Sequence, residues 1–275
     1  MINRINLTKN QLIDSSLSVY NKTGLMQVRI NKLLADLGVA SRRGADSLIG
    51  AGKVLINGRR AKLGEKVDLV HDQLKVSGKT IDESAIKALT TGEKLEYWLL
   101  NKPPGVVSTV SDDLNRQTVM RFLANKSQAR LYPVGRLDFE SEGLLLMTND
   151  GELTHRLTHP KYAIEKEYLV SATGIFSEDK INRLQRGVLL AGKRVRADHV
   201  ELVSRNARNL ELKFILHEGR KREVRRLCAR VGWEVTRLIR LRLAQIQLAD
   251  LKPGTVRKLS DQEIKELKKS VQLED

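Results

Sequence analysis

The stretch that decides the fold is Gly135-Arg136-Leu137-Asp138-Phe139-Glu140-Ser141-Glu142-Gly143, which runs directly into Leu144-Leu145-Leu146-Met147. The four apolar residues predict a short, fully buried strand. The polar stretch ahead of them places an acid beside an arginine between two glycines, which is the composition of an exposed loop held by a rigid sheet. From the spacing alone, an ordinary turn with a surface pair of Arg136 and Asp138 is the commoner outcome.

Short strands and a few helices are predicted around this stretch. The strands lie at 96–100, 144–147, 167–170, 195–203 and 210–216, and the helices begin at 152 and span 221–231. Two prolines and a glycine at 103–105 predict a turn after the first strand. Short links between strands indicate an α+β fold around a mixed, largely antiparallel sheet. No glycine-rich fingerprint follows a strand, so neither a dinucleotide site nor a P-loop is expected.

A smaller basic module precedes this domain, at residues 27–87. Apolar residues at helical spacing predict a helix that ends at Gly38, and Ser41 predicts the N-cap of a second helix. Asn57-Gly58 after the strand at 54–56 predicts a type I′ hairpin. We therefore expect a helix–helix–hairpin domain.

The remaining boundaries follow from composition. A disordered tail is expected at 1–26, a linker at 88–94, the second domain at 95–256, and a C-terminal helix and tail at 257–275.

The net charge points to the class of partner. The chain has 275 residues and a formal charge of +16, from 49 Lys+Arg against 33 Asp+Glu. A surplus of this size in a folded protein favours a polyanion, above all nucleic acid. No run approaches the roughly 18 apolar residues of a membrane span, and one cysteine cannot form a disulfide framework. Aromatic residues make up 4%, which argues against an aromatic stacking platform.

Much of the positive charge falls in two segments. Residues 27–62 hold eight basic and two acidic side chains, and residues 216–242 hold nine and three. In the first, Ser41-Arg42-Arg43 at a helix start suits a phosphate. In the second, arginines from Arg222 to Arg230 share a helix face, which indicates phosphate clamping, with a solvated face as the alternative.

Other candidates are weaker. His155 and His159 are four residues apart, but no third ligand is near, so no metal site is expected. Cys228 is predicted to be a buried, inert thiol. Trp98 and Trp233 are predicted to lie in the core.

Two family resemblances rest on longer motifs. Residues 29–34, 38–43 and 52–58 resemble the alpha-L RNA-binding motif, which implies RNA binding. Residues 27–260 resemble the pseudouridine synthases that modify ribosomal RNA and carry this module at the N-terminus. The matching motifs are residues 100–109, 133–146, 148–151, 159–160, 165–168 and 218–220.

The second resemblance implies a set of catalytic roles. Asp138 would be the nucleophile of an isomerisation that breaks the uridine N-glycosidic bond and rejoins the base through carbon. Tyr168 would pack against the target base, and Arg225 would pair with Asp138. No cofactor or metal is implied. One departure is Arg240-Leu241-Arg242-Leu243-Ala244, where relatives often show Arg-x-Arg-x-Gly.

The resemblance also implies RNA contacts. Arg136 would fill the gap left by a flipped-out base. Lys166 would support the site, and Leu238 would lie opposite the tyrosine. The other residues expected to bind RNA are Arg29, Arg42, Arg43, Lys53 and Arg222.

The implied partner is ribosomal RNA or an assembling ribosomal subunit. Residues 222–227 and 259–263 resemble the large-subunit enzymes more closely. We expect a cytoplasmic monomer that does not bind membranes. The alternatives are the same reaction on small-subunit RNA, a non-catalytic ribosome assembly factor, and a small-molecule hydrolase with an aspartate nucleophile, although the last leaves the charge of +16 unexplained.

Overall fold

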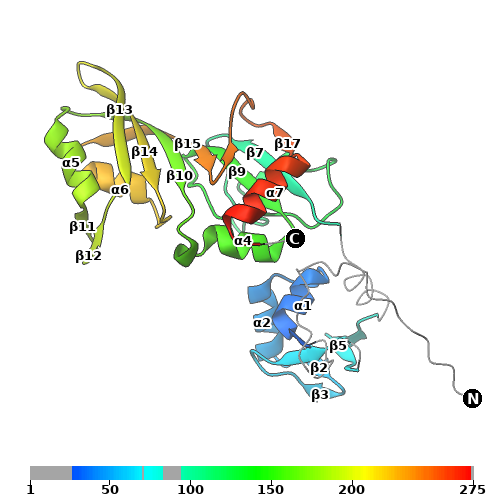
Figure 1. Ribbon diagram of the computed structural model, residues 1–275. Helices are drawn as coiled ribbons and strands as arrows, with labels where there is room; N and C mark the ends of the chain where they lie inside the picture. The colour runs from blue at the N-terminus through cyan, green and yellow to red at the C-terminus, as the bar shows by residue number, and fades with distance from the viewer. Residues whose placement is uncertain (1–26, 70, 83–93, 274–275) are drawn as a thin grey trace, which may run out of the picture. The chain divides into compact units, whose positions relative to one another are not determined.

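The computed structural model describes residues 27–69, 71–82 and 94–273 (Figure 1). The chain divides into two compact units, with the boundary between Lys94 and Leu95. The tail expected at 1–26 and nearly all of the linker expected at 88–94 lie outside the described residues. None of the helices within the described ranges is long and apolar enough to cross a bilayer.

The first unit has the predicted helix–helix–hairpin order. Its elements are β1 (Gln27–Arg29), α1 (Ile30–Asp36), α2 (Arg42–Gly50), β2 (Val54–Ile56), β3 (Arg59–Arg60), β4 (Lys66–Asp68), β5 (Leu74–Val76) and β6 (Lys79–Thr80). Ser41 caps α2 by accepting a hydrogen bond from the Gly44 amide. Asn57 and Gly58 both have positive φ, at 51° and 82°, as a type I′ turn requires. One core joins both helices to the hairpin, including Leu34, Ile49 and Val54.

The second unit is built on one large sheet. Its strands are β7 (Tyr97–Lys102), β8 (Tyr132–Pro133), β9 (Glu142–Thr148), β10 (Lys166–Thr173), β13 (His199–Asn206), β14 (Asn209–Leu216), β15 (Glu234–Leu243), β16 (Ile246–Gln247) and β17 (Val256–Lys258). The main order is β13-β14-β10-β15-β9-β7-β17. The β15–β9 pairing is parallel and the other recorded pairings are antiparallel, so the predicted mixed α+β sheet is confirmed.

Helices and short elements cover this sheet. They are η2 (Val119–Phe122), α4 (Gly151–Thr158), η3 (Pro160–Tyr162), α5 (Glu178–Arg186), α6 (Glu223–Arg230) and α7 (Asp261–Ser270), with a hairpin of β11 (Val188–Leu190) and β12 (Lys193–Val195).

Alternation along the strands separates two hydrophobic cores. In β9, Leu145 packs on one side with α5 and α6, and Leu144 packs on the other with α4 and α7. Leu267 of α7 is fully buried in the second core, so the C-terminal helix is part of the packed unit. Trp98, Trp233 and Cys228 are buried as predicted, and burial raises the pKa of the Cys228 thiol to about 12.

Several local predictions are wrong. The strand expected at 195–203 is interrupted, because Val195 closes β12 and His199 begins β13. The helix expected at 221–231 begins at Glu223, because Arg222 adopts a left-handed conformation with φ of 52°. The sequence analysis did not predict α5 or the ten-residue β15, whose arginines at 237, 240 and 242 obscure a strand pattern.

Candidate active site

The candidate site lies where the two halves of the sheet join. Glu142 and Gly143 of β9 pair in parallel with Ile239 and Arg240 of β15. A Cβ atom on Gly143 would lie 2.4 Å from the Arg240 carbonyl oxygen, so this approach requires glycine. The loop that carries Asp138 enters β9 directly at this junction.

The segment after β7 holds the Asp138 loop in place. Lys102 is completely buried, and its Nζ donates to the carbonyls of Ser141, at 2.8 Å, and Phe139, at 3.4 Å. The Ser108 hydroxyl donates to the Leu137 carbonyl and accepts from the Leu137 amide. These bonds fix the backbone on both sides of Asp138.

Lys102 also places a positive charge under the loop. Burial lowers the pKa of Lys102 to about 8, and the carboxylates of Glu142 and Asp138 oppose that shift. Sequence analysis missed this role, although Lys102 lies inside the motif at 100–109.

Leu137, the neighbour of Asp138, packs in the same core as Tyr168. Leu238 also contributes to this core, on the α6 side. Tyr168 is 8% exposed. Asp138 is half-buried, and its carboxylate makes no hydrogen bond or ion pair with the described residues.

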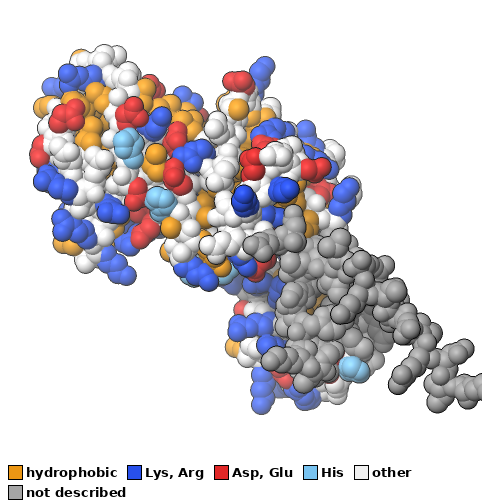
Figure 2. Space-filling view, in the orientation of Figure 1, with side chains coloured by type: hydrophobic (Ala, Val, Ile, Leu, Met, Phe, Trp, Pro, Cys, Tyr) orange, Lys and Arg blue, Asp and Glu red, His pale blue; other side chains and the backbone are white. Residues whose placement is uncertain are grey.

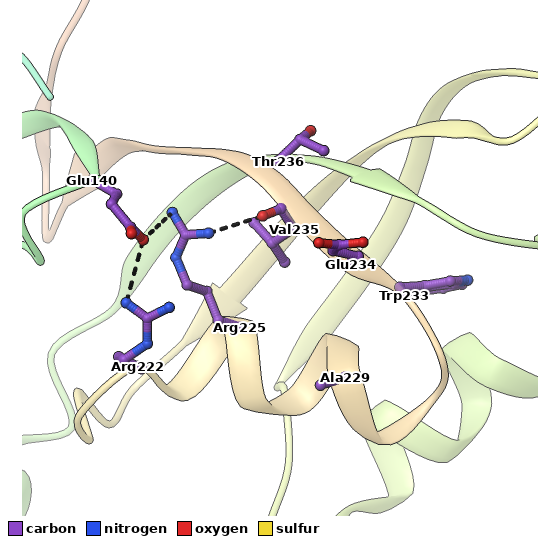
Figure 3. A pocket seen from close by; sticks show the side chains of 8 residues that line it. All are labelled: Glu140, Arg222, Arg225, Ala229, Trp233, Glu234, Val235 and Thr236. Carbon is purple, nitrogen blue, oxygen red and sulfur yellow. Dashed lines mark hydrogen bonds and ion pairs between the residues drawn. The ribbon is translucent and has the colours of Figure 1, made fainter.

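Arg225 does not form the expected ion pair with Asp138 among the described residues. Its Nη1 donates to the Val235 carbonyl at 2.9 Å, and its Nη2 lies 3.8 Å from Glu140 Oε2. Arg222 Nη1 lies 3.4 Å from the same oxygen (Figure 3). Glu140 takes the position expected for Asp138 because it is more exposed on the same loop and reaches both guanidinium groups.

Glu140, Arg222 and Arg225 line one side of a pocket of about 480 Å³. The lining continues along the start of β15, where Val235 and Thr236 contribute. The lining holds two arginines, the carboxylates of Glu140 and Glu234, and the Thr236 hydroxyl, so the pocket suits a polar ligand.

Some buried polar side-chain atoms of the second unit have no hydrogen-bond partner among the described residues. Four such side-chain atoms occur among the described residues, namely Ser141 Oγ, Glu223 Oε1, Arg225 Nε and Arg240 Nη2. Buried polar atoms in folded proteins are nearly always paired with protein or with water, so these four atoms can accept a partner from solvent or from a ligand.

Lys166 supports the site from within. Its Nζ donates to the carbonyls of Ile164, at 2.7 Å, and His217, at 3.1 Å. Burial and the nearby Arg240 lower the pKa of Lys166 to about 8, while Glu223 opposes that shift. Burial in turn raises the pKa of Glu223. Lys166 therefore braces the end of β10, and its ammonium is not presented to solvent as a free cation.

Leu238 is buried, whereas the remaining residues expected to bind RNA, including Arg222, are exposed. Arg136, on the loop before Asp138, forms no hydrogen bond or ion pair with the described residues. In the first unit the expected residues Arg29, Arg42, Arg43 and Lys53 are all exposed. They are available for contacts with phosphates.

Comparisons with known families cover both units. Residues 96–230 match the family model described as RNA pseudouridylate synthase. Residues 28–74 match the S4 domain model.

Individual relatives match over nearly their whole length. The chain is 39% identical to the ribosomal large subunit pseudouridine synthase B of Bacillus subtilis, over 87% of this chain and 95% of that protein. It is 36% identical to an uncharacterized RNA pseudouridine synthase of Aquifex aeolicus, over 90% and 97%. A crystal structure of a pseudouridylate synthase superposes with a TM-score of 0.58 at 30% identity, covering 87% of this chain and 99% of that one.

Proposed function

The chain belongs to the RNA pseudouridylate synthase family, and from that premise we propose that it isomerises a uridine of large-subunit ribosomal RNA to pseudouridine. The family supplies the reaction class, since its members are isomerases. The ribosomal substrate rests on relatives named as large-subunit enzymes, of which the Bacillus subtilis protein is 39% identical. The observation that carries the proposal is the Asp138 loop, anchored by Lys102 at the junction of β9 and β15.

The proposed reaction conserves every heavy atom of the nucleotide. The bond between C1′ and N1 breaks, the base turns, and a bond forms between C1′ and C5. The C5 proton leaves, and N1 gains one. Asp138 is the proposed nucleophile because its carboxylate is half-buried and unpaired among the described residues, and a carboxylate can form a covalent intermediate and leave again.

The remaining side chains have proposed supporting roles. Tyr168 and Leu238 form an apolar wall for the target base on the α6 side of the sheet. Arg136 is exposed beside the site and can fill the space that the flipped base leaves in the RNA stack. Arg225 lines the adjoining pocket and can move from Glu140 to Asp138, since both carboxylates lie on one loop.

Replacing Asp138 tests the proposal. D138N keeps the shape of the side chain but removes its charge, so it should abolish pseudouridine formation and leave RNA affinity nearly unchanged. D113N makes the same exchange at an exposed position and should behave as wild type. The measurement is chemical mapping of pseudouridine in transcripts of both ribosomal RNAs. Activity in D138N would contradict the nucleophile assignment, and modification of small-subunit RNA alone would contradict the substrate.

A further inference from the structure

A second cationic pocket lies at the other end of α6. Its volume is about 450 Å³, and its lining includes four arginines from three elements: Arg183 and Arg186 of α5, Arg194 of β12, and Arg230 of α6. Figure 2 shows Lys and Arg side chains over the end of the molecule that holds α5 and the β11–β12 hairpin. Arg230 belongs to the arginine face expected on α6, and the other three arginines have no proposed catalytic role.

The protein's own carboxylates neutralise little of the positive charge of these four guanidinium groups. Arg186 Nη2 lies 3.4 Å from Asp179, and both side chains are about two-thirds exposed. The side chains of Arg183, Arg194 and Arg230 form no hydrogen bond or ion pair with the described residues. Four like charges with one carboxylate beside them repel one another, so the arrangement gains stability when an anion binds.

The backbone is built to bring these arginines together. Gly187 ends α5 with φ of 96°, and a Cβ atom there would lie 3.1 Å from Arg194 Cγ. Arg194 can therefore lie against the end of the helix. Arg194 of β12 pairs with Leu189 of the neighbouring strand β11, and the Leu189 side chain is 62% exposed. The pocket thus offers an apolar contact beside its cations, which suits a nucleotide better than a bare inorganic anion.

This pocket and the candidate site both use residues of α6. Arg225 and Ala229 line the first pocket, and Arg230 lines the second. At about 1.5 Å per helical residue, Arg225 and Arg230 lie only about 7.5 Å apart along the α6 axis. At about 100° per residue they are also about 140° apart around that axis, so an RNA strand that contacts both pockets would have to pass around α6.

We propose that the Arg183–Arg186–Arg194–Arg230 pocket binds the phosphodiester backbone of the RNA substrate outside the target nucleotide. The pocket extends the RNA footprint and takes no part in the chemistry. This inference rests on the proposed function, because it presumes an RNA substrate. A purely structural explanation is that Arg183, Arg186 and Arg230 stabilise the C-terminal turns of their helices, which would affect stability alone.

The test compares two double variants of the full chain. R183Q/R194Q removes two charges from the pocket. K265Q/K269Q removes two charges from exposed positions of α7, which packs on the opposite face of the sheet. The probes are a large-subunit rRNA transcript that wild type binds, and a short stem-loop cut from it around the modified uridine. Binding is titrated across salt concentrations, and thermal unfolding checks that both variants fold.

We expect R183Q/R194Q to weaken binding of the long transcript about tenfold. Its slope of log affinity against log salt should become shallower by about 1.5, for two lost phosphate contacts. The short stem-loop should bind equally well, and kcat at saturating RNA should stay at the wild-type value. Equal effects of the two double variants, or a change confined to stability, would overturn the inference. Binding is measured apart from modification, so a wild-type protein that binds but forms no pseudouridine would contradict the proposed function alone.

Discussion

At the scale of single residues, Glu140 is the least expected participant. It lies two positions after Asp138, and one of its oxygens contacts both Arg222 and Arg225. Arg222 is held in a left-handed conformation at the start of α6, so the contact depends on a backbone shape that few non-glycine residues adopt. Glu140 therefore occupies two arginines that would be available to an RNA phosphate under the proposed function.

Replacing Glu140 should strengthen RNA binding. E140Q removes the competing carboxylate, and an exposed ion pair of this kind contributes about 0.2–1 kcal/mol. We expect an increase in affinity of up to about fivefold at low salt, which disappears as salt rises. Filter binding of wild type, E140Q and the matched variant E152Q measures it. Weaker binding by E140Q would show instead that Glu140 accepts hydrogen bonds from the RNA.

At the scale of elements, the site depends on one short parallel pairing. Two residues of β9 and two of β15 join the half of the sheet that carries Asp138 to the half that carries Tyr168. Gly143 permits that approach, because the Arg240 backbone leaves no room for a Cβ atom. Gly143 therefore helps to set how far apart Asp138 and Tyr168 lie, although it is neither the proposed nucleophile nor part of the proposed base-binding wall.

Alanine at Gly143 should damage both stability and activity. A positive φ and a 2.4 Å backbone contact predict a loss of about 2–4 kcal/mol in unfolding free energy. Because β9 and β15 would separate, kcat should fall further than the folded fraction accounts for. The control is G192A, where φ is also positive but space is open, and it should lose only about 1 kcal/mol. Denaturant unfolding and single-turnover rates measure the two effects. Wild-type kcat in a folded G143A protein would contradict this account.

At the scale of the whole molecule, the positive charge is present in both units. The first unit presents Arg29, Arg42, Arg43 and Lys53 on its surface, while the second holds arginines at both ends of α6. The match of residues 28–74 to the S4 domain covers the first set. We therefore expect contacts between the first unit and RNA to change the affinity for RNA and to leave the chemical step unchanged.

Removing charge from the start of α2 should separate binding from chemistry. R42Q/R43Q should raise KM and make the salt dependence of binding shallower by about 1.5, with kcat unchanged at saturating RNA. K66Q/K79Q, which removes two exposed lysines from the same unit, serves as the comparison. If both double variants weaken RNA binding equally, the effect comes from net charge alone, and the start of α2 is not a phosphate site.

Local patterns were enough to predict much of this protein. Ser41, Asn57-Gly58 and the apolar run at 144–147 each specify a cap, a turn or a strand through their own chemistry, and the structure has all three. The α+β class and the mixed sheet follow from the order of such elements. The motif around Asp138 carries the resemblance to the family, whose model matches residues 96–230.

Contacts between distant segments were decided only by the tertiary structure. The parallel pairing of β9 with β15, the burial of Lys102 beneath Phe139 and Ser141, and the exchange of Asp138 for Glu140 as the partner of Arg225 all join residues far apart in the chain. The pocket of four arginines likewise combines α5, β12 and α6, and α5 itself was not predicted. Sequence periodicity reports on neighbours within one element, whereas pairing between elements depends on which buried surfaces pack best, and only the folded chain determines that.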